Sequence, residues 1–281
     1  MFGVHLSRLR RLAIVASAVG LVALAGACSS GDDETNYVEG SVTELYNEAM
    51  DLLLAQRYED AAKRFDEVDR QHPYSVWATK AQLMSAYSYY MGEDHDEAII
   101  GLDRYIQLHP SSRDVAYAYY LKGLAFFDQI NDVKRDQVAA RESKKAFEEL
   151  VRRFASTTYA RDARERIDLI QDHLAGKEME VGRYYQRRGQ HLAAINRFQL
   201  VAEKYQTTSH VPEALHRLAE SYTALGLPHE AQKVAAILGY NYPASEWYID
   251  SYELVSHETV ERPDGSAGNR SLITRAWDWL F

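Results

Sequence analysis

Cysteine is nearly absent from this sequence: Cys28 is the only one among 281 residues. A disulfide within the chain is therefore excluded, and the fold has to rest on packing alone. After Cys28 no apolar run reaches the roughly 18 residues that a membrane-spanning helix needs. The sequence also lacks a His-Glu-x-x-His pair, a glycine-rich phosphate loop and a Gly-x-Ser-x-Gly elbow. These absences point away from a disulfide-stabilised domain, a transmembrane protein and an enzyme.

Residues 1–27 are predicted to be a lipoprotein signal peptide. Basic residues precede an uncharged apolar stretch over 12–27, and small residues lead into Cys28. Lipoproteins usually carry leucine three residues before the cysteine, where this chain has Ala25, and Leu24 lies one place earlier. Cleavage after Ala27 to release a secreted protein is therefore the alternative. We expect lipidation at Cys28, and Ser29 after it favours sorting to the outer membrane. The polar, acidic residues 28–41 are interpreted as a flexible tether.

The charge of the chain is acidic overall. The net charge is −9, and removing the three arginines of the signal lowers it to −12. An acidic surface repels both nucleic acid and anionic lipid. We therefore expect no nucleic-acid partner and contact with the membrane only through the lipid anchor.

A repeat organises the chain after the tether. Equivalent alanines lie 37 residues apart in two places, and in three copies a proline follows the alanine by 12 residues. The alanines are Ala61 and Ala98, then Ala194 and Ala231, and the prolines are Pro73, Pro110 and Pro243. Apolar residues recur at helical spacing on both sides of each turn, and proline ends the second helix. The pattern predicts an all-α tetratricopeptide-repeat solenoid of about five helix pairs, in which neighbours bury each other's apolar stripes.

The five predicted repeats cover about 42–74, 79–111, 116–156, 175–207 and 212–244. The third is irregular, with helices near 115–127 and 141–154 and a polar insertion at 128–137. A linking helix at about 160–174 leads to the fourth. We therefore divide the chain into an N-terminal half (42–156), a C-terminal half (157–245) and an extension (246–281). In the extension, residues 256–270 have a loop-like composition, and residues 271–281 are predicted to form a short helix carrying Trp277, Trp279 and Phe281.

Aromatic residues are concentrated in the first helices of the first three repeats. In tetratricopeptide solenoids these helices line the concave surface, so the rings would form a trough for an extended peptide with aromatic side chains. The alternative is that most of the rings pack the core. The predicted trough consists of Tyr46, Met50, Leu53, Leu83, Tyr87, Tyr90, Tyr117, Tyr120 and Phe127.

The fourth repeat is basic, although the chain as a whole is acidic. Its arginines are Arg183, Arg187, Arg188 and Arg197. A guanidinium group can bind a carboxylate through two parallel hydrogen bonds, so these residues are candidates for docking an acidic partner. A solvated helix face is the alternative interpretation. Scattered histidines, such as His95 among acidic residues, fit solvated turns better than a metal site, and we expect no metal or other cofactor.

The sequence resembles the BamD family, once called ComL, of outer membrane protein assembly factors. Besides the signal, the tether and the long repeats, particular strings carry the resemblance from Cys28 to about residue 245. They are His109-Pro110-Ser111, residues 120–125 (Tyr-Leu-Lys-Gly-Leu-Ala), residues 181–189 (Val-Gly-Arg-Tyr-Tyr-Gln-Arg-Arg-Gly), residues 194–197 (Ala-Ile-Asn-Arg) and residues 231–235 (Ala-Gln-Lys-Val-Ala).

This resemblance implies a non-catalytic lipoprotein of the outer membrane that faces the periplasm. It would belong to the β-barrel assembly (BAM) complex, with BamA and other BAM lipoproteins as partners, and help β-barrel proteins fold and insert. The N-terminal repeats would meet unfolded barrel substrates, in part through their C-terminal segments. The C-terminal repeats would dock on the POTRA domains of BamA, with Arg197 as the best single candidate for the contact.

Other classes of protein use the same repeats. A pilotin-type lipoprotein for a secretin or pilus system is the main alternative function. An envelope-division coordinator is disfavoured because no heptad segment follows Cys28. An enzyme is disfavoured by the missing motifs.

Overall fold

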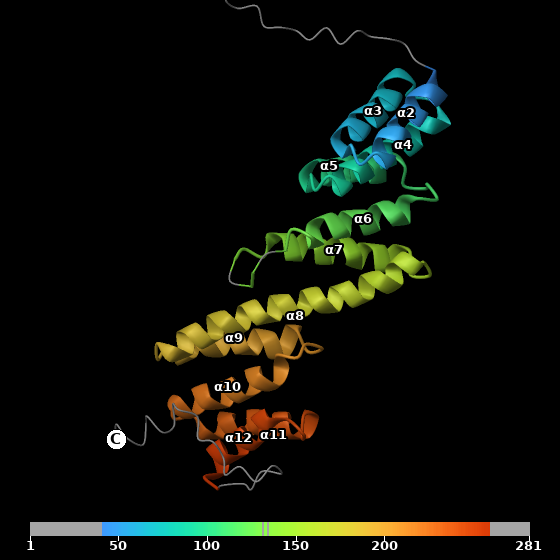
Figure 1. The fold of residues 1–281 in the computed structure, drawn as a ribbon. Coiled ribbons are helices and arrows are strands. Elements are labelled where there is room, and N and C mark those ends of the chain that lie inside the picture. The colour runs from blue at the N-terminus through green and yellow to red at the C-terminus, as the bar shows by residue number, and fades with distance from the viewer. Residues whose placement is uncertain (1–40, 131, 134, 259–281) are drawn as a thin grey trace, which may run out of the picture. The chain divides into compact units, whose positions relative to one another are not determined.

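Helices separated by short turns make up the chain from Val42 to Ser256 in the computed structural model (Figure 1). The structure describes residues 41–130, 132–133 and 135–258. The predicted signal peptide, Cys28, nearly all of the tether and the predicted terminal helix at 271–281 lie outside these ranges. The helices are α2 (Val42–Leu54), α3 (Tyr58–Gln71), α4 (Val76–Met91), α5 (His95–Leu108), α6 (Val115–Phe127), α7 (Val138–Arg153), α8 (Thr158–Arg187), α9 (His191–Lys204), α10 (Val211–Ala224), α11 (Pro228–Asn241) and α12 (Glu246–Ser256).

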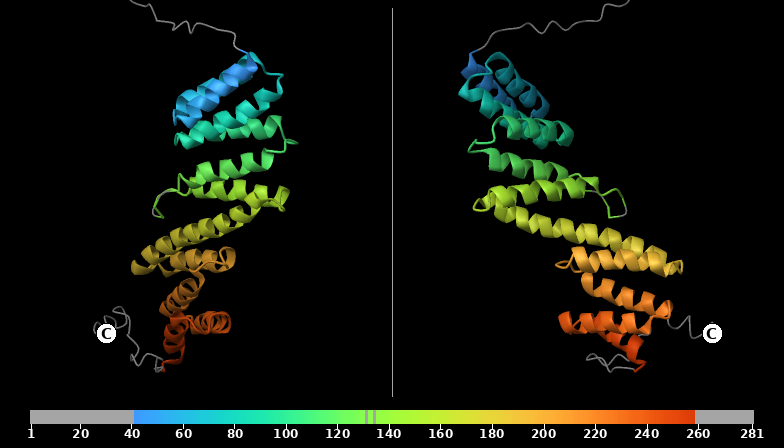
Figure 2. Two further views of the ribbon diagram at one scale, coloured as in Figure 1. Left: turned by 45° about the vertical axis from the view of Figure 1, so that its right-hand side comes forward. Right: turned by 180° about the vertical axis from the view of Figure 1, so that it is seen from behind.

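These helices pack in chain order. Each helix lies against the next one, and the other substantial contacts join helices two places apart, such as α2 with α4 and α10 with α12. Figure 2 shows the same succession from two further sides. The pairs α2/α3, α4/α5, α6/α7 and α10/α11, together with the second half of α8 and α9, are five repeats. The predicted all-α tetratricopeptide fold is confirmed, and the described residues contain no strand.

The turn that leads from one repeat to the next has a constant hydrogen-bonding pattern. The residue after the second helix donates its backbone N–H to a carbonyl four residues earlier, as in His72 to Val68 at 3.0 Å. Its own carbonyl then accepts from the N–H three residues later, Ser75 in this case, also at 3.0 Å. The pattern recurs at His109, Phe154, Tyr205 and Tyr242, before α6, α8, α10 and α12. In three of the five turns proline follows directly, where a helix could not continue.

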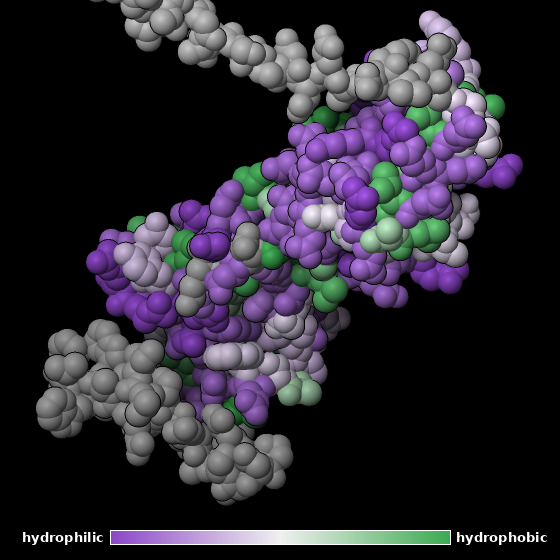
Figure 3. All heavy atoms as spheres, turned by 45° about the horizontal axis from the view of Figure 1, so that its top comes forward, coloured by the Kyte–Doolittle hydropathy of each residue, from purple (hydrophilic) through white to green (hydrophobic). Residues whose placement is uncertain are grey.

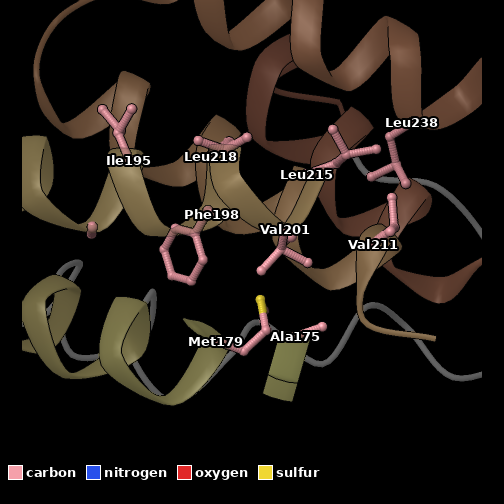
Figure 4. Close-up of a cluster of buried hydrophobic side chains, with 11 residues drawn as sticks. Ala175, Met179, Ile195, Phe198, Val201, Val211, Leu215, Leu218 and Leu238 are labelled. Carbon is pink, nitrogen blue, oxygen red and sulfur yellow. The ribbon is translucent and has the colours of Figure 1, made fainter. Parts of the chain in front are cut away.

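The second helices carry the core. Each buries residues at i, i+4 and i+7, which lie on one helical face. The five sets are Ala61/Phe65/Val68, Ala98/Leu102/Tyr105, Ser143/Phe147/Leu150, Ala194/Phe198/Val201 and Ala231/Ala235/Leu238. Figure 4 shows one such cluster, in which Phe198 and Val201 of α9 pack with Met179 of α8 and Leu215 and Leu218 of α10. Every cluster therefore joins helices that are close neighbours in the chain.

Two glycines allow the closest approach of paired helices. A Cβ atom at Gly123 would lie 2.3 Å from Cε1 of Phe147, and one at Gly182 would lie 2.4 Å from Cε1 of Phe198. Real Cβ atoms do not come so near a ring, so these two phenylalanines can lie flat on the facing helix only over glycine. The ring then fills the space that a side chain would take, at the close packing typical of protein interiors.

Gly123→Ala tests this close approach. Alanine is the better helix former by about 1 kcal/mol, so without a clash the variant would gain stability. Overpacking of a tight core costs about 1–3 kcal/mol, and we expect the clash to dominate and the free energy of unfolding in urea to fall. The double variant Gly123→Ala/Phe147→Leu should recover part of the loss, since the smaller side chain removes the clash. Equal losses in the single and double variants would contradict this account.

The structure departs from the predicted helices in three places. The linking helix and the first helix of the fourth repeat are one continuous helix of 30 residues, α8, since no proline interrupts residues 158–187. Its start is fixed by Thr157, whose side chain accepts from the Ala160 N–H at 3.2 Å. The second helix of the third repeat begins at Val138 rather than 141. A further helix, α12, occupies part of the extension for which no helix was predicted.

Candidate interaction surfaces

The predicted trough residues all lie on first helices, and all except Leu83 are half-buried. Tyr46 and Met50 belong to α2, Tyr87 and Tyr90 to α4, and Tyr117, Tyr120 and Phe127 to α6. Leu53 is half-buried on α2, whereas Leu83 is buried on α4. The rings are thus neither fully enclosed in the core nor freely exposed.

The residues from the first repeat form a group of their own. The Tyr46 ring packs edge-on against Phe65 at 5.3 Å between centroids and lies 4.8 Å from the ring of Trp77. Met50 packs against the same cluster. Burial raises the pKa of the Tyr46 hydroxyl. These contacts fix Tyr46 between its own second helix and the next repeat, which favours a packing role at this position.

The rings of α6 meet residues of α8 that sequence reasoning missed. Tyr159 of α8 lies 5.4 Å from Tyr117 and 5.3 Å from Tyr120, measured between ring centroids. Burial and the neighbouring tyrosines Tyr87, Tyr159 and Tyr120 raise the pKa of Tyr117 to about 12. Tyr159, Asp162 and Arg166 are spaced i, i+3 and i+7, so their shared helical face was a signal available in the sequence.

Two hydroxyl groups of this region are held by carboxylates. The Tyr90 hydroxyl donates to Asp128 at 2.7 Å, and the Tyr120 hydroxyl donates to Asp162 at 2.6 Å. Asp162 also accepts from Nε of Arg166 at 2.7 Å, and the Arg166 guanidinium lies 5.1 Å from the ring centroid of Phe127. The hydrogen bond from the Tyr120 hydroxyl contributes most to lowering the pKa of Asp162, and Arg166 adds to it, although partial burial opposes both. The carboxylates orient the hydroxyls while the rings stay half-buried.

We call this set of residues the aromatic surface: Tyr87, Tyr90, Tyr117, Tyr120, Phe127, Tyr159 and Arg166. It draws on α4, α6 and the first turns of α8. On the face shown in Figure 3 apolar side chains form separate patches among polar ones. A half-buried aromatic set with a nearby cation can contact an apolar or aromatic peptide without first unfolding.

The predicted docking arginines differ in how far they are already engaged. Arg183 is enclosed in ion pairs: its Nη1 lies 2.8 Å and 2.9 Å from the two carboxylate oxygens of Glu213 on α10, and its Nη2 donates to Glu180 at 3.0 Å. Arg197 of α9 donates to Glu178 of α8 at 2.9 Å and keeps 43% of its side chain exposed. Arg183 therefore links two repeats of this chain, and Arg197 is half available to a partner.

The other two arginines are exposed. Arg188 places its guanidinium 5.1 Å from the ring centroid of Tyr184, and Arg187 lies next to it at the end of α8. Within the described ranges neither has a carboxylate at ion-pair distance. Among the predicted docking arginines, the exposed positive charge therefore lies at Arg187, Arg188 and the outer side of Arg197.

Two shallow hollows lie on either side of the middle of α8. One, of about 530 Å³, lies between the start of α7, the residues before it and Tyr205, with Lys177 and Glu178 on its wall. The other, of about 470 Å³, includes Asp172, His173 and His210. In the part of the chain that the structure describes, no cluster of His, Cys, Asp and Glu side chains could hold a metal ion. No helix there is long and apolar enough to cross a membrane.

A polar network fastens α12 to α10. Nδ1 of buried His216 lies 2.8 Å from the Ser251 hydroxyl, and Nε2 lies 3.4 Å from Glu220. The ring of Trp247 stacks 5.2 Å from His216, and the Arg217 guanidinium lies over it at 5.4 Å. Burial by itself would raise the pKa of Glu220. The hydrogen bond from His216 and the charges of His216 and Arg217 outweigh it and lower this pKa to about 2.

The Glu220 carboxylate should therefore make the free energy of unfolding depend on pH in the acidic range. Its folded-state pKa lies below its ordinary value, so its contribution is complete above about pH 4.5 and is lost as the pH falls towards 2. At pH 5.5 we expect Glu220→Gln to lower the free energy of unfolding by the order of 3 kcal/mol, measured by urea titration. At pH 3 the difference from the unmodified chain should be clearly smaller.

Glu230→Gln is the control for this prediction. Glu230 forms a surface ion pair with Lys233 on its own helix, so its loss should leave the free energy of unfolding almost unchanged at either pH. If Glu220→Gln were equally destabilising at pH 5.5 and pH 3, lost packing rather than ionisation would account for its effect.

Paired helices around small residues, together with half-buried rings and arginine ion pairs, define a tetratricopeptide-repeat protein with surfaces suited to contacts with other chains. Residues 38–237 match the family YfiO, described as outer membrane lipoprotein. Because this match covers well over half of the sequence, the chain belongs to that family of outer membrane lipoproteins.

Curated relatives agree with this assignment. "Outer membrane protein assembly factor BamD" of Caulobacter vibrioides is 45% identical over 248 residues, which is 88% of this chain and 81% of the relative. The protein of the same name from Rickettsia prowazekii is 44% identical and covers 89% of this chain and 98% of the relative. Among solved structures, the TPR domain of P58(IPK) has 14% identity and a TM-score of 0.40, over 76% of this chain and 56% of that one. That likeness is too loose to add to the assignment.

Proposed function

We propose that this chain is the tetratricopeptide-repeat lipoprotein of the β-barrel assembly complex, a scaffold that takes part in folding and inserting β-barrel proteins into the outer membrane. The observation that carries the proposal is the similarity to assembly factors named BamD, which extends over nearly nine-tenths of the chain. The all-α repeat fold supports a binding role without catalysis. Nothing in the comparisons favours a pilotin-type lipoprotein.

The anchor in this proposal is the lipidated Cys28, which would place the folded repeats on the periplasmic side of the outer membrane. Two features support it: the small residues before Cys28 in the sequence, and the lipoprotein description of the family. Acyl chains embed in the membrane by the burial of CH₂ groups. The acidic repeats then have no need to bind lipid themselves.

Unfolded β-barrel chains would be bound in the N-terminal half, on the aromatic surface. Barrel strands alternate apolar and polar residues, with aromatic side chains near both membrane interfaces. A strand in extended conformation thus offers rings in a row to the half-buried rings of α4 and α6. Arg166 beside Phe127 supplies a positive charge for a terminal or side-chain carboxylate.

Tyr87→Ala/Tyr90→Ala should weaken binding of peptides taken from the C-termini of barrel proteins by about tenfold or more, since stacking on an aromatic side chain is lost. The measurement is fluorescence anisotropy of a labelled peptide. Tyr74→Ala is the matched control, because Tyr74 is fully exposed in the turn before α4. If affinity persists while the thermal midpoint falls, the two rings serve the core and the peptide binds elsewhere.

The C-terminal half would dock on the POTRA domains of BamA through Arg187, Arg188 and Arg197. The first two arginines are exposed beside each other, and Arg197 keeps an outer side free while it pairs with Glu178. Arginine is enriched in the interface positions that dominate binding energy, and a guanidinium group can bind a carboxylate of the partner through two hydrogen bonds. Arg183 is less suited to this role, since Glu213 and Glu180 already occupy its donors.

Arg197→Glu should reduce capture of BamA from detergent-solubilised membranes by tenfold or more, as charge reversal at a docking contact adds repulsion. Lys63→Glu, which makes the same charge change on an exposed site of α3, should leave capture unchanged. The swapped variant Arg197→Glu/Glu178→Arg restores the internal ion pair. If the swap also restores capture, Arg197 acts only by holding α8 to α9, and a direct contact with BamA is wrong.

The proposal as a whole is tested by affinity purification of the tagged chain from native membranes, followed by mass spectrometry. Recovery of a large barrel protein with POTRA domains supports an assembly scaffold. Recovery of a secretin or a pilus component in its place would overturn the proposal and leave the fold intact.

A further inference from the structure

The helix α12 begins like the first helix of a repeat. The turn that precedes it has the same hydrogen bonds as the turns before α4, α6, α8 and α10: Tyr242 N–H to the Leu238 carbonyl at 2.8 Å and Ser245 N–H to the Tyr242 carbonyl at 3.0 Å. The sequence repeats as well, since Pro73-x-Ser-x-Trp77 before and in α4 matches Pro243-x-Ser-x-Trp247 before and in α12. The described helices therefore stop after the first half of a sixth repeat.

Counting from this turn shows which side of α12 should meet a second helix. In α6 the positions ten and fourteen residues after the turn are Tyr119 and Gly123, and both face α7. The ring of Tyr119 packs 5.9 Å from that of Phe154, and Gly123 lies under Phe147. In α4 the same positions reach the partner α5 as well: Gln82 bonds to His109 at 2.8 Å while also donating to Asp69 of α3 at 2.8 Å, and Ala86 lies against Gly101.

The corresponding residues of α12 are Tyr252 and Ser256. Tyr252 is 38% exposed, whereas its counterpart in α10, Leu215, is 5% exposed against α11. Ser256 is small, as are Ala86 and Gly123 at the same position. Only one residue of α12, Ser251, is buried, although each earlier first helix buries at least two. The side that would face a second helix therefore carries the exposed ring of Tyr252, whose hydroxyl donates to Glu258 at 3.2 Å, and the small Ser256.

The sequence after α12 contains one segment suited to this side. Residues 271–281 place apolar side chains at i, i+1, i+4, i+5, i+8 and i+9: Leu272, Ile273, Ala276, Trp277, Leu280 and Phe281. Within this stripe Ile273, Trp277 and Leu280 reproduce the i, i+4, i+7 set that every second helix buries. The match is incomplete, because the earlier sets begin with alanine or serine and Ile273 is larger.

We propose that residues 271–281 form the second helix of the sixth repeat and cover the Tyr252/Ser256 side of α12. Residues 257–270 would connect the two helices. Repeat three sets the precedent for such a connection, since the segment 128–137 separates α6 from α7. By the register of that repeat, Trp277 takes the place of Phe147 and lies over Ser256, as Phe147 lies over Gly123. The pairing would bury the exposed Tyr252 side of α12 as second helices bury the first helices before them.

The tail is a better occupant than a separate chain because it is already tethered. Fourteen intervening residues keep the stripe at millimolar effective concentration. A stripe with so few residues would not form a stable helix alone in water. The helix at 271–281 would therefore form only against α12. In turn, the protection of the α12 amides from hydrogen exchange would depend on the tail.

Hydrogen exchange of the α12 amides tests this dependence in the full-length chain. Ile273→Asp/Trp277→Asp breaks the stripe, and we expect exchange across Ile249–Ser256 to speed up about tenfold or more. Arg275→Gln and Asp278→Asn change charge on the opposite face and should leave exchange within about twofold of the unmodified chain. Unchanged exchange in the stripe variant would overturn the proposal. Protection of α12 that disappears on dilution would also overturn it, because α12 would then be covered by a second copy of the chain.

A cross-link provides a second measurement that does not depend on the stability of variants. In a Cys28→Ser background, Ser256→Cys/Trp277→Cys should form an intramolecular disulfide under mild oxidation, whereas Ser256→Cys/Trp279→Cys should form little. Equal yields, or disulfides only between chains, would contradict the pairing. If the stripe variant lost binding to lipid vesicles while α12 exchange stayed the same, the tail would be a membrane contact and the proposal would be wrong.

Discussion

The fold depends on the packing of one bulky second-helix side chain against a small residue of the helix before it. Phe147 over Gly123 and Phe198 over Gly182 are the closest cases between paired helices, and Tyr248 of α12 lies equally close over Gly239 of α11. No disulfide can replace this packing, since Cys28 is the only cysteine. Each contact involves neighbours in the chain, so stability is a sum over adjacent helices rather than the property of one central core.

Polar links follow the same nearest-neighbour rule and decide which surfaces remain available. Asp162 holds Tyr120 across α6 and α8, Glu213 holds Arg183 across α8 and α10, and Glu178 holds Arg197 across α8 and α9. A group bound in this way loses little further freedom when a partner arrives. The same bonds also occupy hydrogen-bond donors of the arginines. A charged residue on the surface is therefore not automatically able to bind a partner.

Most of the architecture could be predicted from the sequence, but less could be predicted about the interaction surfaces. Alanine and proline spacing predicted the helix pairs because both residues act locally, through close approach and helix termination. Continuity of α8 was not predicted, since a linker and a first helix look alike when no proline separates them. For α12 the shared Pro-x-Ser-x-Trp string was an available signal that was missed. The side-chain pairs between helices could not be predicted from the sequence. That Arg183 pairs with Glu213, and Tyr120 with Asp162, depends on how successive repeats are placed.

Continuity of α8 restricts how the length of this chain can vary. Asp162 and Arg166 lie near its start, and Arg183 and Arg187 lie near its end, with no loop between them. One residue inserted in the middle would turn one end about 100° relative to the other. Both sets of contacts could not then be kept. We therefore expect a one-residue insertion or deletion at the centre of α8 to act on both halves at once, in contrast to one in the segment 128–137 between α6 and α7.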